Sequence, residues 1–186
     1  MRSLFLMLAM LLSTAVSHAA EVKSSSPWRF DIYPLNLELR YERDASQQLV
    51  DRRPLNFAVG VRRDSSTVLL EYSSFTEKTG NATLAIDREH TEYLVWWKEN
   101  LINMEVVDFY ITAGAGAYQE EVTTSLSGSA NTTDSSGFQM MGGGSGGAQT
   151  MIADLVLINI EARLMIGKNF DPNPQASLLV RLGVEF

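Results

Sequence analysis

Acidic and basic side chains recur at every second position along several stretches of the chain. Successive side chains in a β-strand point to opposite faces, so residues two apart share one face. On that basis one face collects seven acids and four arginines: Glu38, Arg40, Glu42, Arg62, Glu71, Glu92, Asp108, Glu161, Arg163, Arg181 and Glu185. Charges held in a narrow interior of low polarity must pair and hydrogen-bond. The chemistry that this pattern predicts is a network of ion pairs.

Catalytic and metal-binding groups are scarce. The sequence has no cysteine, which excludes disulfides, thiolate metal sites and cysteine nucleophiles. After residue 20 its one histidine is His90, and no serine lies beside it in a recognisable motif. We therefore interpret His90 as an exposed residue near a hairpin. The sequence predicts no enzyme, no cofactor and no metal site.

The elements that must position the charges are β-strands with strict alternation. The clearest begins at Pro34, where Leu35, Leu37, Leu39 and Tyr41 oppose the charged set. Similar stretches lie at 55–62, 67–73, 107–118, 155–166 and 175–186. The stretch at 84–97 changes phase, which predicts a bulge near 88–90. The glycine-rich stretch at 137–149 resembles a linker, but without a strand there the count is seven. Counting it as a strand gives eight, the even number that bacterial single-chain barrels use.

The last strand carries the most specific signal. Ala176, Leu178, Val180, Leu182, Val184 and Phe186 share one face, and the other face holds Arg181 and Glu185. An ordinary amphipathic edge strand has the same alternation. However, alternating apolar residues with a final Phe resemble the closing strand of small bacterial outer-membrane β-barrels of the OmpA and OmpX type. The resemblance implies an all-β, eight-stranded antiparallel up-and-down transmembrane β-barrel. It also implies that Phe186, Val184 and Leu182 are a signal for the barrel-insertion machinery.

The amino terminus predicts export. Arg2, a short apolar run from Leu4 to Leu12 and the small residues at 17–20 match a cleaved signal peptide over 1–20. The barrel domain then spans 21–186. We expect it in the bacterial outer membrane, in contact with lipid and monomeric. The net charge is −7 over the whole chain, without a basic cluster, which argues against nucleic acid as a partner.

Loop lengths and aromatic residues orient the predicted barrel. Tight turns at 63–66, 98–103 and 150–154 belong on the periplasmic side, and loops at 44–53, 76–82, 122–136 and 168–174 belong outside. The long Ser/Thr/Gly-rich loop at 122–136 is a candidate surface for an unknown ligand. Two aromatic belts are predicted at the membrane interfaces, comprising Tyr41, Phe57 and Tyr72 outside and Trp96 and Trp97 on the periplasmic side.

Three functions remain open from the sequence. The first is a structural or surface-interaction protein whose lumen is plugged by paired charges, because eight-stranded barrels are just wide enough for side chains to fill them. The second is a small gated pore, in which a pair such as Glu161 with Arg181 exchanges partners. The third is an exported soluble carrier of the lipocalin kind, with an apolar interior and a polar exterior. Strand alternation alone fits either orientation of the two faces.

Overall fold

A computed structural model describes residues 28–43, 49–80, 84–126 and 131–186. The predicted signal peptide over 1–20 lies outside the described residues. Among the residues that are described, no helix is long and apolar enough to cross a membrane. The regular elements are ten strands: β1 (Arg29–Arg43), β2 (Leu49–Arg52), β3 (Leu55–Arg63), β4 (Ser66–Gly80), β5 (Leu84–Asn103), β6 (Asp108–Leu126), β7 (Thr132–Ser135), β8 (Gln139–Ile152), β9 (Val156–Gly167) and β10 (Gln175–Glu185).

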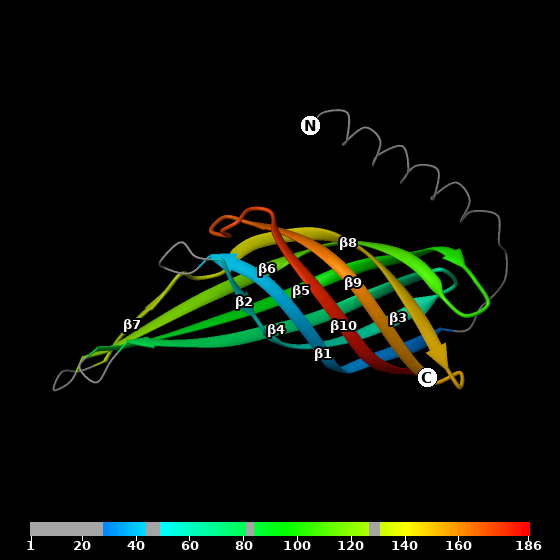
Figure 1. The fold of residues 1–186 in the computed structure, drawn as a ribbon, viewed down its shortest axis with the longest axis horizontal. Coiled ribbons are helices and arrows are strands. Elements are labelled where there is room, and N and C mark those ends of the chain that lie inside the picture. The colour runs from blue at the N-terminus through cyan, green and yellow to red at the C-terminus, as the bar shows by residue number, and fades with distance from the viewer. Residues whose placement is uncertain (1–27, 44–48, 81–83, 127–130) are drawn as a thin grey trace, which may run out of the picture.

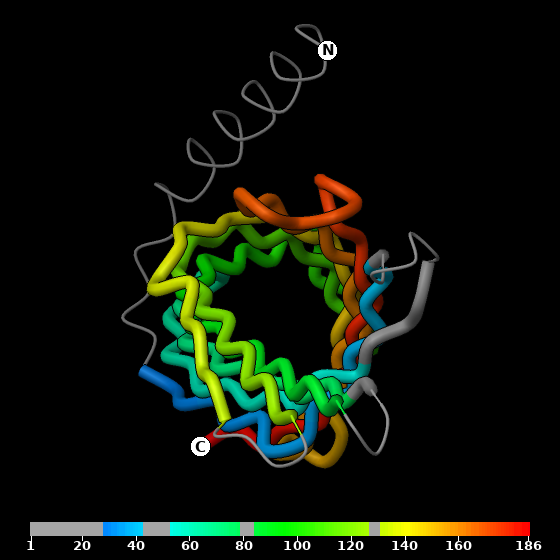
Figure 2. The backbone as a smooth tube through the Cα atoms, turned by 90° about the vertical axis from the view of Figure 1, so that its left-hand side faces the viewer, coloured from blue at the N-terminus to red at the C-terminus, as the bar shows by residue number. Residues whose placement is uncertain are grey.

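Eight of these strands close into one antiparallel barrel. They follow the order β1, β3, β4, β5, β6, β8, β9 and β10, and β10 pairs with β1 to close the ring. Figure 2 shows this ring of backbone, and Figure 1 shows the last strand beside the first. The amide of Phe30 donates to the carbonyl of Phe186, and the amide of Phe186 donates back to Phe30. The prediction of an all-β, eight-stranded antiparallel barrel is confirmed, and the uncertain stretch at 137–149 forms most of β8.

The two short strands lengthen the barrel wall at one end. β2 pairs with β1 beyond the part of β1 that pairs with β3, and the break falls at Arg53–Pro54. β7 pairs with β6 beyond the part that pairs with β8. The predicted loop at 122–136 is therefore wrong in part, because β6 continues to Leu126 and β7 returns along it. The ends of β4, β5 and β6 beyond the closed ring, together with β7, form a sheet of residues 75–80, 84–91, 119–126 and 132–135 that projects past the rest of the barrel (Figure 1). We call it the projecting sheet.

Three other predicted boundaries need correction. The loop at 76–82 is mostly strand, since β4 runs to Gly80 and pairs with β5 down to Ala85. The turn predicted at 98–103 is the end of β5, and the chain turns at Met104–Val107 instead. β5 has no bulge near 88–90, because its pairing with β4 and β6 is continuous there. Leu84 and Ile86 belong to the same row as the inward-facing side chains of β5, but they lie past the end of the closed barrel. For this reason the apolar residues change from one row to the other near the start of the strand.

A bulge does occur in β1. Its pairing shifts register between Ile32 and Leu35 against β10, and between Tyr33 and Asn36 against β3. Pro34 lies at this shift, where a missing backbone N–H costs no ladder hydrogen bond. As a result Asp31 and Tyr33 face inward, as do Asn36, Glu38 and Arg40 after the shift. The strand therefore begins earlier than alternation alone predicts.

The two faces of the wall have opposite chemistry. The buried residues along the bore include Glu38, Arg40, Glu71, Glu161 and Arg163, together with an apolar cluster around Trp96 and Leu157. The exposed residues are mainly large and apolar, such as Leu37, Leu70, Val95, Ile160 and Leu178. The alternative of a soluble lipocalin-like carrier is wrong, because that architecture needs the apolar face inside.

Glycine in β6 lets the bore hold large side chains. A Cβ on Gly114 would lie 2.6 Å from Cδ2 of Trp96 and 2.6 Å from the carbonyl oxygen of Val95. Trp96 has no exposed surface and fills the bore at this level. By contrast, a Cβ on Gly146 points outward and meets only the carbonyl oxygen of Tyr110, at 4.0 Å.

The glycine pair yields a matched test. Gly114→Ala should lower the free energy of unfolding by about 1–3 kcal/mol, because the backbone oxygen of Val95 cannot move aside and Trp96 must shift. Gly146→Ala should change it by less than about 0.5 kcal/mol. Urea unfolding of the refolded barrel in lipid vesicles, followed by tryptophan fluorescence, measures both. Equal effects would contradict the packing described for Trp96.

Candidate functional site: the charged bore

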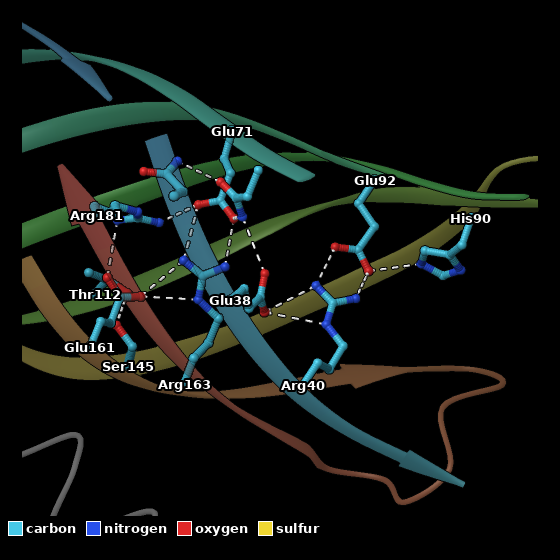
Figure 3. Close-up of polar contacts among 12 residues, drawn as sticks. Glu38, Arg40, Glu71, His90, Glu92, Thr112, Ser145, Glu161, Arg163 and Arg181 are labelled. Carbon is cyan, nitrogen blue, oxygen red and sulfur yellow. Dashed lines mark hydrogen bonds and ion pairs between the residues drawn. The ribbon is translucent and has the colours of Figure 1, made fainter. Parts of the chain in front are cut away.

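A ring of four charged side chains crosses the middle of the bore. Glu71 comes from β4, Glu161 and Arg163 from β9, and Arg181 from β10. Arg163 donates from Nη1 and Nη2 to the two oxygens of Glu71, at 2.7 and 3.0 Å, and from Nε to Glu161 at 3.0 Å. Arg181 donates to Glu161 at 3.1 Å and also to Glu71. Each arginine therefore binds both glutamates (Figure 3). We call this group the central ring.

Neutral side chains support the central ring from the other strands. Asn56 Nδ2 donates to Glu71 at 2.7 Å, and the hydroxyl of Tyr110 donates to Glu161 at 3.2 Å. The guanidinium of Arg163 lies 4.4 Å from the ring centre of Trp96, a cation–π arrangement. All four charged members are at most 3% exposed. Buried charges are stable only when they are paired and hydrogen-bonded, and these partners supply further hydrogen bonds and hold the ring in place.

A second group, the upper cluster, lies toward the projecting sheet. Arg40 donates to Glu38 at 3.2 Å and to Glu92 at 2.9 Å. His90 Nε2 lies 2.8 Å from the same Glu92. Asn56 Nδ2 also reaches Glu38, at 3.3 Å, and so links the upper cluster to the central ring. Figure 3 shows the continuous path from His90 to Arg181.

A third group, the lower cluster, lies where β1 begins and β10 finishes. Arg62 pairs with Asp31 at 3.1 Å and with Glu185 at 2.7 Å, and Arg29 pairs with Glu185 at 2.7 Å. Lys98, 1% exposed, donates to Gln149, and its ammonium lies 4.0 Å above the ring of Tyr110. Charged groups thus occupy the bore along its whole described length.

Comparisons with known proteins agree with the fold of this barrel. The solved structure of Neisserial surface protein A matches with a TM-score of 0.62 and 12% identity, over 85% of this chain and 95% of that chain. The structure of Ail, the attachment invasion locus protein of Yersinia pestis, matches with a TM-score of 0.56 and 14% identity, over 88% and 100%. The chain has the fold of the small eight-stranded outer-membrane barrels. No family model matches the sequence, and no curated protein matches it.

In this outer-membrane-type barrel, nine of the eleven residues predicted for the charged face lie together in the three groups, and two lie at the margins. Glu42 is only partly buried, 4.0 Å from Arg40, and accepts from Gln175. Asp108 accepts from Gln149 at 3.3 Å. The nine grouped residues are Glu38, Arg40, Arg62, Glu71, Glu92, Glu161, Arg163, Arg181 and Glu185.

Sequence reasoning missed several members of the barrel interior. Asp31 was missed because the bulge at Pro34 reverses the alternation. Lys98 was missed because the sequence analysis placed it in a turn. The prediction that His90 is exposed is wrong: it is 8% exposed and binds Glu92. Glu92 sits in the inward-facing row as the alternation predicts, with Arg40 as its partner. The sequence contained the information needed to place His90, because it lies two residues before Glu92 and therefore belongs to the same inward-facing row.

The predicted aromatic belts divide between the two faces of the wall. Tyr41, Phe57, Tyr72 and Trp97 are 39–56% exposed and point outward. Placing Trp96 in a belt is wrong, because it is buried in the bore under Arg163. Adjacent residues in a strand cannot both face outward without a bulge. On the outward face, Tyr72 contacts Tyr93, with ring centres 5.4 Å apart.

Loss of a member of the central ring is expected to lower the stability of the barrel strongly. Glu71→Ala removes the acceptor shared by Arg163, Arg181 and Asn56 and leaves buried charge without compensation. The free energy of unfolding should fall by about 3–5 kcal/mol.

Urea unfolding in lipid vesicles measures that change, and Glu89→Ala is the control because Glu89 is an exposed acid on β5. The control should shift by no more than about 0.5 kcal/mol. A loss below 1 kcal/mol for Glu71→Ala would show that the ring does not hold the barrel together.

Proposed function

We propose that this chain is an integral protein of a bacterial outer membrane that acts through its outer surface and does not catalyse a reaction. The observation that carries the proposal is the reversal of the two faces, with an apolar exterior around a charged, ion-paired bore. Such an exterior is unfavourable in water and suits a lipid environment. Both solved structures reported above are of bacterial proteins, and one is a surface protein by name.

Loop lengths support one orientation. Three tight connections, at 64–65, 104–107 and 153–155, lie at the end where β1 begins and β10 finishes. The projecting sheet lies at the opposite end (Figure 1). Outer-membrane barrels carry short turns on the periplasmic side and longer segments outside. In this orientation the projecting sheet extends beyond the cell surface, and we propose it as the interaction surface in place of the predicted loop at 122–136.

The charge of the projecting sheet bears on its partner. Six acids and two basic residues lie on it: Glu77, Asp87, Glu89, Glu120, Glu121, Asp134, Lys78 and Arg88. Ail has been solved in complex with the heparin analogue sucrose octasulfate, a polyanion. The acidic balance of the sheet in this chain opposes binding of a polyanion. We therefore propose a neutral or basic partner.

Assembly follows from the same proposal. Phe186 and Leu182 are exposed on the outward face of β10, and Val184 lies between them in the same row. In this proposal the three residues are read by the insertion machinery, after the signal peptide over 1–20 directs export. The mature barrel is a monomer in contact with lipid.

The proposed surface role does not use the bore as a channel. Trp96, Tyr33, Leu69, Leu157 and Met165 fill it between the charged groups, and each is at most 1% exposed. The gated pore is the second candidate, and one observation favours it. Arg181 and Arg163 already bind both Glu71 and Glu161, so a change of partners needs little movement.

Surface labelling tests location and orientation together. The chain has no cysteine, so single cysteines are unambiguous probes. Thr133→Cys, on β7, should react with a membrane-impermeant maleimide in intact cells. Glu105→Cys, in the turn between β5 and β6, should react only after the outer membrane is permeabilised. Recovery of the protein in the soluble periplasmic fraction, or the reverse labelling pattern, would contradict the proposal.

Conductance separates the closed bore from the pore. The refolded wild-type protein in planar bilayers should show no current steps. Glu161→Ala should also stay silent, because Arg163 and Arg181 keep Glu71 as a partner and the aromatic residues still fill the bore. Current steps in the variant alone would favour the gated pore and overturn the closed bore.

A further inference from the structure

One acidic side chain lies on the outward face of the barrel wall, among apolar residues. Glu99 of β5 belongs to the same row as Tyr93, Val95 and Trp97, whose side chains point outward. It lies near the end of β5, at the end of the barrel that carries the tight turns (Figure 1). A carboxylate beside acyl chains is unfavourable unless its charge is matched. The position of Glu99 therefore requires a partner.

Neutral donors hold the carboxylate of Glu99 in place. The hydroxyl of Ser65 donates to Oε1, the hydroxyl of Ser66 donates to Oε2 at 2.5 Å, and Nε1 of Trp97 donates to Oε2 at 3.3 Å. These donors orient both oxygens but bring no charge. Among the described residues, no basic side chain forms an ion pair with Glu99. The neighbouring Lys98 points into the bore and is 1% exposed. The negative charge of Glu99 is therefore unmatched by the described part of the chain.

A cation lies in line with Glu99 on the same outward face. Arg63 is opposite Ser66 in the pairing of β3 with β4, and Ser66 is opposite Glu99 in the pairing of β4 with β5. Neighbouring strands are about 4.8 Å apart, so the backbones of Arg63 and Glu99 are about 10 Å apart. Arg63 is 52% exposed over the ring of Trp28, and its 3.9 Å contact with Asp64 is an exposed and therefore weak ion pair. We call Arg63, Ser66 and Glu99 the rim row.

The rim row borders the apolar outer surface of the wall. Val61, Val68 and Trp97 follow it on β3, β4 and β5 toward the middle of the barrel, and they are 36%, 40% and 56% exposed. Exposed apolar side chains of this kind suit acyl chains, and tryptophan is favoured at the boundary between acyl chains and headgroups. The rim row thus lies where the charged part of a lipid meets its apolar part.

We propose that the rim row binds the headgroup of a phospholipid that carries a primary ammonium group, such as phosphatidylethanolamine. The ammonium N–H groups donate to Glu99, the phosphate accepts from Arg63, and an acyl chain lies against Val68 and Trp97. An ionised carboxylate has about four acceptor positions, so Glu99 can accept from the ammonium as well as from its three present donors. The inference rests on the membrane location proposed above and adds a lipid class to it.

Native mass spectrometry of the refolded protein in neutral detergent micelles tests the proposal. The probes are phosphatidylethanolamine, phosphatidylcholine and phosphatidylglycerol with identical acyl chains. The wild type should retain phosphatidylethanolamine about fivefold more than either other lipid, the size expected for one partly exposed ion pair. Glu99→Gln keeps an acceptor oxygen and removes the charge, so the three lipids should be retained equally. Arg63→Gln should weaken all three by a similar factor, because each carries the phosphate.

Glu105→Gln is the matched control. Glu105 is an exposed acid in the turn between β5 and β6, at the same end of the barrel. This variant should keep the lipid preference of the wild type. Equal loss of preference in Glu105→Gln and Glu99→Gln would reveal general attraction to an acidic surface and overturn the proposal. Retention of phosphatidylcholine as strong as that of phosphatidylethanolamine in the wild type would also overturn it, because a quaternary ammonium has no N–H to donate.

Ser66→Ala covers the case in which Glu99→Gln fails to fold. It removes one donor that orients Glu99 and should reduce the preference for phosphatidylethanolamine, and an unchanged preference would contradict the proposed site. Lipid retention is measured in micelles and location by surface labelling of cells. A failure of the lipid proposal therefore remains distinguishable from a failure of the outer-membrane proposal.

Discussion

The shared coordination of Glu71 by two arginines is the interaction on which the barrel interior depends. Glu71 lies on β4 and Arg163 on β9, four places apart in a ring of eight strands, so this pair joins opposite walls. Arg181 adds a third strand, and Asn56 a fourth. Sheet hydrogen bonds join only neighbouring strands. The central ring is what ties the walls to one another across the bore.

Burial of so much charge constrains the residues around it. Removing ions from water costs several kcal/mol for each ion, and only nearly complete pairing offsets that cost. The structure meets this requirement with two carboxylates and two guanidiniums at the centre, and with hydrogen bonds from Tyr110 and Asn56. Large rings such as Trp96 exclude water and stack on the guanidinium, and Gly114 provides the space they need. Ion pairing, ring stacking and small residues such as Gly114 therefore act together to offset the cost of burying these charges.

The two ends of the barrel differ for the same reason. At the end where β1 begins and β10 finishes, the lower cluster matches acids with arginines close to tight turns. At the other end, three long strands continue past the barrel, and acids exceed basic residues on the projecting sheet. Charge there does not have to be paired inside a closed bore, because water reaches it. An acidic sheet favours a neutral or basic partner, which gives this end its proposed role in binding.

The sequence by itself determined the strand faces and the number of barrel strands. Alternation of the kind seen at Leu178–Glu185 reports which side chains share a face, because the period of two is a local property of the backbone. Tertiary structure alone decided the pairings. Glu71 and Arg181 are far apart along the chain, and only the closed register brings them together. The same holds for the neighbours of Trp96: alternation turns its side chain inward, but only the closed barrel places Arg163 against its ring. It also holds for Asp31, which lies inward because of the bulge at Pro34. Local patterns fix the direction of a side chain, whereas its partner depends on which strands become neighbours when the barrel closes.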